Sequence, residues 1–80
     1  MINYTERFQY NNEDYEIKFM NDEDKVYAIL FQNNLPTNIE SIISMEIWKD
    51  SISAKNINIK ETIIDAIKEE LYKAIQENKN

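Results

Sequence analysis

The alternation of apolar and polar side chains divides the first part of the chain into three segments typical of β-strands. Residues 2–10 and 15–20 alternate as expected for strands that bury one face, and residues 25–32 form a third apolar segment. The intervening stretches, NNED and NDED, predict turns, because Asn and Asp tolerate left-handed backbone and hydrogen-bond to their own main chain.

Residues 25–32, KVYAILFQ, are apolar on both alternating sets: Val26, Ala28 and Leu30 on one side, and Tyr27, Ile29 and Phe31 on the other. A strand that is covered on both faces reads as such a continuous apolar run. We therefore expect an inner strand that requires cover on both faces, in a chain that offers one clear helix.

The middle of the chain is less regular. Its Asn and Pro content predicts a loop over residues 33–38. Residues 39–49 fit either a helix or a strand, and their β-branched residues and serines favour a strand over residues 42–48. Residues 50–56 are expected to connect this strand to the last element.

Residues 59–77 predict an amphipathic helix. Asn58 and Glu61 have the spacing of a capping box at its start. One face carries an apolar stripe at helical spacing: Ile59, Ile63, Ala66, Ile67, Leu71, Ala74 and Ile75. The sequence thus predicts an α+β fold, a single domain over residues 1–80 with an antiparallel meander of three to four strands and one C-terminal helix packed on one face.

Strand pairing decides which side chains share a face. If the first turn has four residues, Tyr10 pairs with Tyr15. Across the second turn, the corresponding pair is Phe19 with Val26. One face then consists of Phe8, Tyr10, Tyr15, Ile17, Phe19, Val26, Ala28 and Leu30, and we expect the helix to cover it.

The opposite face would expose three apolar side chains of the inner strand, and Trp48 joins them if Ile43, Met45 and Ile47 face the helix. The predicted apolar interface is therefore Tyr27, Ile29, Phe31 and Trp48. Exposed apolar patches mark interaction sites, and Tyr and Trp are favoured at binding hot spots. Three alternatives remain: residues 33–41 or 50–57 fold back over this face, a second copy covers it, or another protein does.

Composition narrows the function classes. The net charge is −6 at pH 7, which disfavours direct binding to nucleic acid, because that binding depends on Lys and Arg neutralising phosphates. With no His, Cys or Gly, the chain has no common general base, thiolate ligand or Gly-rich phosphate loop. We expect no enzyme, no cofactor and no metal. The absence of a signal peptide or membrane span predicts a cytoplasmic protein, and the Ile, Asn and Lys bias suits a bacterial or phage genome.

Three acidic groups are candidates for contact with a basic partner. They are Glu13 and Asp14 in the first turn, Asp22, Glu23 and Asp24 in the second turn, and Glu61, Asp65 and Glu69 along the helix. Each also fits an ordinary solvated surface, and the two turns lie at opposite ends of the second strand, so their carboxylates are not expected to converge.

Two function classes follow. The first is a small acidic protein-binding module that inhibits or regulates another protein, including one whose basic nucleic-acid-binding surface attracts carboxylates. Phage-encoded anti-CRISPR proteins and toxin-neutralising immunity proteins are similar in size and charge, an analogy that rests on no motif. The second is a structural or assembly protein that forms a homodimer through the outer face of the sheet.

Overall fold

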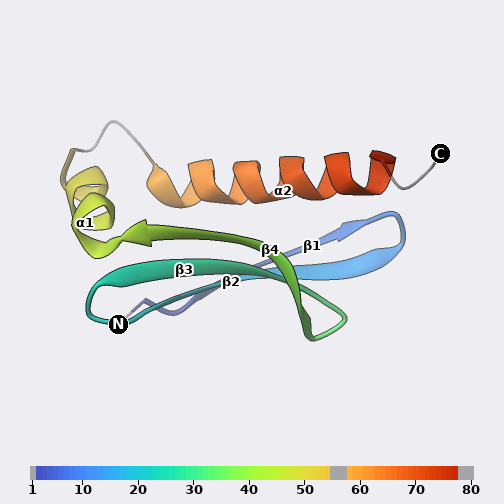
Figure 1. Ribbon diagram of the computed structural model, residues 1–80, viewed down its shortest axis with the longest axis horizontal. Coiled ribbons are helices and arrows are strands. Elements are labelled where there is room, and N and C mark those ends of the chain that lie inside the picture. The colour runs from blue at the N-terminus through green and yellow to red at the C-terminus, as the bar shows by residue number, and fades with distance from the viewer. Residues whose placement is uncertain (1, 55–57, 78–80) are drawn as a thin grey trace.

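The computed structural model describes residues 2–54 and 58–77. A four-stranded antiparallel sheet in the order β1-β2-β3-β4 is followed by two helices, which confirms the predicted α+β class (Figure 1). The elements are β1 (Tyr4–Tyr10), β2 (Glu13–Asn21), β3 (Lys25–Gln32), β4 (Leu35–Ser44), α1 (Met45–Ala54) and α2 (Ile59–Glu77).

The β1–β2 and β3–β4 turns have the same construction. Asn11 and Asn12 have φ of 56° and 65°, and Asn33 and Asn34 have φ of 51° and 68°. Positive φ at both central residues of a two-residue loop is the type I′ geometry, whose twist matches that of the flanking strands. Asn fills these positions in a chain without Gly, because its short polar side chain tolerates the left-handed region.

The observed turns between β1 and β2 and between β2 and β3 correct the predicted strand register. Phe8, and not Tyr10, pairs with Tyr15, and Phe19 pairs with Ala28 in place of Val26. Both errors are shifts of two residues, caused by the assumption of longer turns. Because side chains alternate with a period of two, each residue kept its predicted face.

The predicted loop over residues 33–38 and the predicted strand over residues 42–48 are each right over only part of their length, since residues 42–44 are strand and residues 45–48 are helix. Only Asn33 and Asn34 form a turn, and β4 then runs from Leu35 to Ser44. Pro36 is accommodated because β4 is an edge strand, where a missing N–H costs no ladder hydrogen bond.

A second helix, α1, begins directly after β4. The Ser44 hydroxyl accepts a hydrogen bond of 3.1 Å from the Ile47 N–H, so Ser44 is the N-cap that ends the strand and starts the helix. Residues 50–54, predicted as part of a connecting segment, belong to α1, and residues 55 and 56 of that segment lie outside the described residues.

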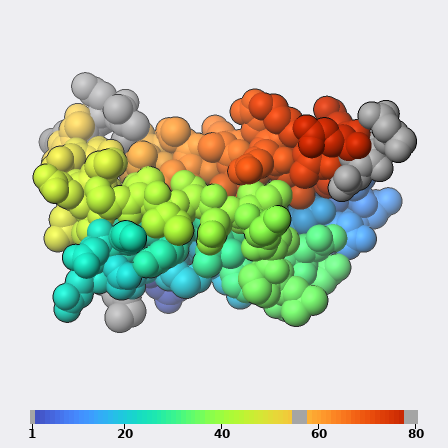
Figure 2. Space-filling model, viewed as in Figure 1, coloured from blue at the N-terminus to red at the C-terminus, as the bar shows by residue number. Residues whose placement is uncertain are grey.

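The predicted bounds of the last helix, 59–77, are confirmed. Its predicted cap is also present, because the Glu61 N–H donates a hydrogen bond of 3.1 Å to Asn58 Oδ1. Figure 2 shows α2, coloured orange to red, lying along β4, coloured green.

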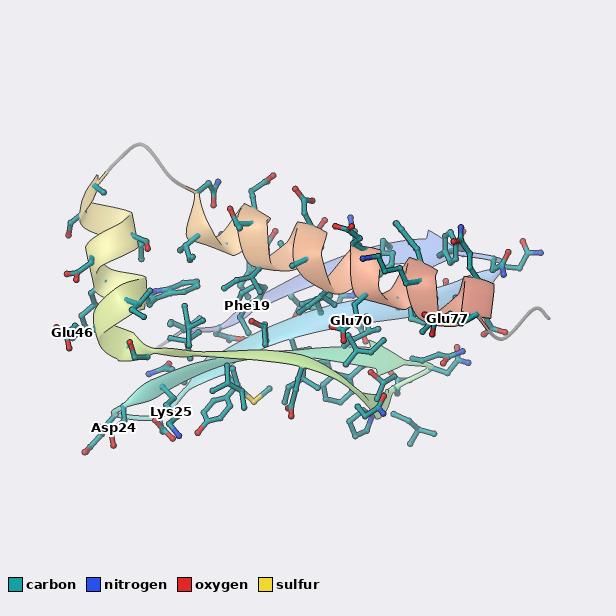
Figure 3. All side chains as sticks on the ribbon, turned by 45° about the horizontal axis from the view of Figure 1, so that its top comes forward. Phe19, Asp24, Lys25, Glu46, Glu70 and Glu77 are labelled. Carbon is teal, nitrogen blue, oxygen red and sulfur yellow. The ribbon has the colours of Figure 1, made fainter. Side chains whose placement is uncertain are left out.

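The core lies between the sheet and the two helices. Both helices are on the same side of the sheet, and Phe19 points into the space between them (Figure 3). At the other end of the sheet the rings of Tyr10 and Tyr72 have centroids 4.4 Å apart. The buried cluster consists of Tyr15, Ile17, Phe19, Val26, Ala28, Leu30, Trp48, Ile63, Ile64, Ile67 and Leu71.

Candidate protein-binding surface

We call the sheet surface that faces the helices the inner face, and the opposite surface the outer face. The strand register places side chains of the outer face in rows that cross β2, β3 and β4. Three rows consist of Met20, Tyr27 and Ile42, then Lys18, Ile29 and Glu40, then Glu16, Phe31 and Pro36. We call the apolar members of these rows the apolar strip: Met20, Tyr27, Ile29, Phe31, Pro36 and Ile42.

The apolar strip is only partly covered by its neighbours. Ile42 is 49% exposed and Met20 is 38% exposed, whereas Tyr27, Ile29 and Phe31 are half-buried. Figure 3 shows side chains of the sheet that project away from both helices. Within residues 2–54 and 58–77, no element lies over this face.

The two segments that were expected as possible cover for the outer face lie elsewhere in the fold. Residues 33–41 belong to the β3–β4 hairpin and are part of the sheet itself. Residues 50–54 belong to α1, whose Trp48 lies in the inner-face core. Residues 55–57 lie outside the described residues. The fold-back alternative is therefore wrong for residues 33–41 and 50–54.

The placement of Trp48 on the outer face is wrong. Trp48 lies on α1 and is 8% exposed, and its ring centroid is 6.0 Å from that of Phe19 in the core. The alternation of Ile43, Met45 and Ile47 suggested a continued strand, but the Ser44 cap changes the period at that point and turns Trp48 inward. Trp48 thus contributes to stability and is not available to a partner.

Tyr27 connects the apolar strip to the β2–β3 turn. Its hydroxyl donates a hydrogen bond of 2.7 Å to Asp22 Oδ2, while Asp22 Oδ1 accepts from the backbone N–H groups of Asp24 at 2.8 Å and Lys25 at 2.7 Å. The Tyr27 hydroxyl and the two backbone donors lower the pKa of Asp22, and the same hydroxyl–carboxylate bond raises the pKa of Tyr27. Asp22 therefore holds the turn together.

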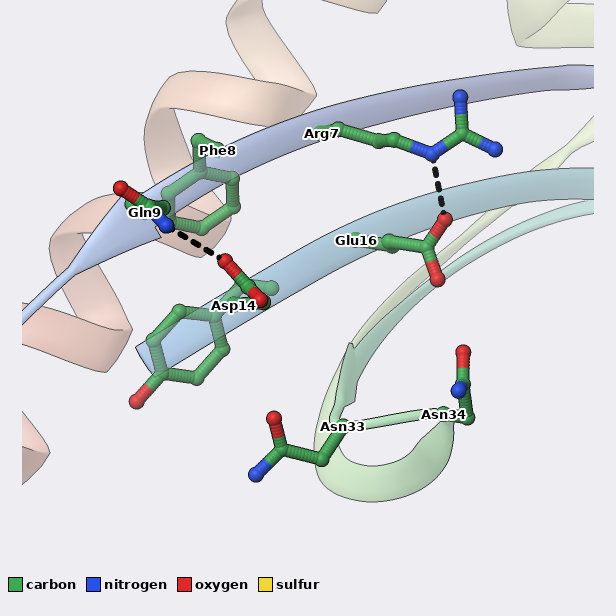
Figure 4. Close-up of a pocket in the computed structure, with 8 residues that line it drawn as sticks. Arg7, Phe8, Gln9, Asp14, Glu16, Asn33 and Asn34 are labelled. Atoms are coloured by element: carbon green, nitrogen blue, oxygen red, sulfur yellow. Dashed lines mark hydrogen bonds and ion pairs between the residues drawn. The ribbon is translucent and has the colours of Figure 1, made fainter. Parts of the chain in front are cut away.

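Charged side chains on the outer face have partners close by. Arg7 Nε and Glu16 Oε2 are 2.8 Å apart, and the Gln9 amide donates a hydrogen bond of 2.8 Å to Asp14 Oδ1. Both pairs line an open hollow between the β1–β2 hairpin and the β3–β4 turn (Figure 4). These two pairs leave the terminal nitrogens of Arg7, whose side chain is 77% exposed, and the amide of Asn34 without a partner among the residues that line the hollow.

Lys18 lies beside the apolar strip, and its ammonium group is 4.4 Å from the centre of the Phe31 ring. A cation over an aromatic face is attracted by the ring quadrupole. The Phe31 ring is half-buried. The ammonium group itself remains at the surface of the outer face.

The three predicted acidic groups stay apart. Glu13 and Asp14 lie at one end of β2, with Glu13 accepting a hydrogen bond of 3.1 Å from Asn33, and Asp22, Glu23 and Asp24 lie at the other end. Glu61, Asp65 and Glu69 are exposed along α2, on the helix side of the sheet, and Glu69 faces Lys73 at 3.6 Å. Among the described residues, no cluster of acidic side chains has the arrangement of a metal site.

Sequence reasoning missed four residues of these rows: Met20, Pro36, Glu40 and Ile42. Met20 follows the alternation of β2 and was recognisable from it, whereas the other three lie on β4 and depend on its register against β3. The register of β4 could not be predicted because residues 33–38 were expected to form a loop.

Comparisons of the chain with protein-family models, with curated proteins and with solved structures give no match. No helix in the described part of the chain is long and apolar enough to cross a membrane.

Proposed function

We propose that this chain is a non-enzymatic protein-binding module and that the outer face of its sheet is the binding surface. The observation that carries the proposal is the apolar strip, which crosses three strands on the side that neither helix covers. Contiguous exposed apolar surface is uncommon on monomeric proteins and marks protein–protein interaction sites.

The chemistry of the surface supports a protein partner. Aromatic residues and Met are enriched at protein interfaces, and the strip contains Tyr27, Phe31 and Met20. The strands hold these side chains at fixed spacing, so little conformational entropy is lost when a partner docks. Nucleic acid is a poor partner for this face, because Arg7 is paired with Glu16 and the whole chain carries a net charge of −6.

The narrower hypothesis, an inhibitor that masks a basic nucleic-acid-binding surface, requires several carboxylates that face one partner. The row Glu61, Asp65 and Glu69 on α2 is the acidic group best placed for this, because its members are exposed at successive helical turns. Asp22 is a poor contributor, because one carboxylate oxygen accepts from backbone N–H groups of the β2–β3 turn and the other accepts from the Tyr27 hydroxyl. Inhibition therefore stays a prediction that is independent of the apolar strip.

The proposal is tested by capture from cells that produce tagged and untagged copies of the chain. Ile29→Glu places a charge at the centre of the strip, and Ala66→Glu adds the same charge at an exposed position of α2 as a matched control. We expect the wild type and Ala66→Glu to retain the same protein, either an untagged copy or another protein, and Ile29→Glu to lose it.

Equal retention by a folded Ile29→Glu variant, or no protein retained by the wild type, would contradict the proposal. Thermal unfolding followed by circular dichroism shows whether both variants are folded.

A further inference from the structure

The charges on the strand positions of the outer face balance, unlike those of the whole chain, and the Asp22 carboxylate lies at the margin of this face, where it accepts a hydrogen bond from the Tyr27 hydroxyl. The net charge of the chain is −6, yet the strand positions of the outer face carry three cations and three carboxylates: Arg7, Lys18, Lys25, Asp14, Glu16 and Glu40. The excess negative charge therefore lies on the turns, the helices and the inner-face margin. An acidic face would repel a second copy of itself, whereas a neutral apolar face does not.

The middle row of the outer face is complementary to itself. Ile29 lies on β3, with Lys18 beside it on β2 and Glu40 beside it on β4. Neighbouring strands are about 4.8 Å apart, so the backbone positions of Lys18 and Glu40 lie at equal distances on either side of Ile29. A two-fold axis that runs parallel to β3 above Ile29 therefore places Lys18 over the partner's Glu40, and Glu40 over the partner's Lys18.

The other two rows also bring apolar side chains together across a two-fold axis parallel to β3. Met20 and Ile42 flank Tyr27, so Met20 would lie over the partner's Ile42, while Tyr27 and Phe31 would meet their own copies on the axis. A two-fold axis perpendicular to β3 above Ile29 would place Lys18 over the partner's Lys18, and Glu40 over the partner's Glu40. Like charges facing each other across an interface are strongly unfavourable, so the charge pattern selects the axis along β3.

We propose that a second copy of this chain covers the outer face, in a two-fold dimer whose axis runs along β3. This inference rests on the proposed function, since it names the occupant of the same surface. The two sheets pack face to face with their strands aligned, as in β-sandwiches, and the interface is isologous because each copy contributes the same patch. In each dimer the Lys18 ammonium group, which lies 4.4 Å from the centre of the Phe31 ring in the single chain, turns to the partner's Glu40, at two contacts related by the axis.

The test uses two charge reversals, Lys18→Glu and Glu40→Lys, in solution mass measurements. Each variant alone places like charges at both contacts, so we expect its dimer dissociation constant to rise by about 100-fold. When the two variants are mixed, the heterodimer has opposite charges at both contacts, and we expect association to return to that of the wild type. The double variant, which exchanges the two charges, is also expected to form a dimer.

Matched controls separate this pattern from a general effect of charge. Lys73→Glu and Glu69→Lys make the same changes in net charge on exposed positions of α2, and we expect each to associate as the wild type does. Unfolding curves for each variant show that the fold is retained.

Three results would overturn the dimer: a wild type that stays monomeric, single variants that associate like the wild type, or a mixture that does not associate. The second result is the one expected if copies pair instead through the exposed edge of β4. A monomeric wild type that retains a different protein, and loses it in Ile29→Glu, would refute the dimer and leave the proposed function standing.

Discussion

The two faces of β3 have opposite environments although their side chains are similar in kind. On the inner face, Val26, Ala28 and Leu30 are buried beneath the helices, and Leu30 is 0% exposed. On the outer face, Tyr27, Ile29 and Phe31 are half-buried, and no described element covers them. The sequence makes this strand apolar on both sides, but the fold covers only one.

The inner-face residues of β3 stabilise the fold, whereas its outer-face residues keep exposed area that a partner could cover. Burial of an Ile or Leu side chain contributes about 1.5–3 kcal/mol, and this gain is already made on the inner face when the chain folds. On the outer face, the remaining exposed area contributes only when another surface covers it. Neighbouring residues of one strand therefore have different roles.

The largest expected loss of stability comes from a substitution on the inner face. Leu30→Ala should lower the free energy of unfolding by about 2–5 kcal/mol, because it leaves a cavity in the core. Ile29→Ala, one residue away, should lower it by about 1 kcal/mol in the monomer, because its side chain is half-exposed. Urea unfolding at low protein concentration measures both, and equal losses would contradict the assignment of the two faces.

A smaller effect concerns the turns that fix which side chains share a face. Asn12→Ala and Asn34→Ala should each lower the free energy of unfolding by about 1–2 kcal/mol, because Ala at positive φ brings its Cβ too close to the following carbonyl. Asn38→Ala in β4 is the matched control and should change stability by less than about 0.5 kcal/mol. Thermal unfolding measures the series, and a control as damaging as the turn variants would argue against the type I′ geometry.

The smallest expected effect is the pH dependence that Asp22 contributes. Its folded pKa is lowered, chiefly by the Tyr27 hydroxyl, so the stability it adds is fully present above its unfolded pKa of about 4. This stability is lost as the pH falls through the folded pKa. Asp22→Asn should therefore show a weaker decline in stability at acidic pH than the wild type. Parallel pH profiles of unfolding would contradict this assignment.

The sequence predicted most of the framework, because its signals are local. The stripe of residues 59–77 and the Asn58 cap located α2, alternation located β1 and β2, and a continuous apolar run located β3. The turns were harder to predict, since NNED fits a two-residue turn as well as a four-residue one. In residues 35–54, the Asn, Pro and β-branched composition pointed to a loop and a late strand, whereas strand pairing and the Ser44 cap decided the result.

The candidate surface was predicted in part for the same reason. Tyr27, Ile29 and Phe31 share a face by parity within one strand, so no tertiary information was required. Ile42 and Glu40 join them only through the pairing of β3 with β4, and Trp48 leaves them because of a helix that the composition disfavoured. Features that depend on contacts between segments were the ones that the sequence did not reveal.

We propose above that the outer face is an interface between two copies of this chain. The most direct test is the solution mass of the wild type by light scattering over a concentration series, beside the Ile29→Glu variant. We predict that the wild-type mass rises from 9.6 kDa toward twice that value with concentration, while a folded Ile29→Glu variant stays at 9.6 kDa. A wild type that remains at 9.6 kDa over the whole series would contradict the claim.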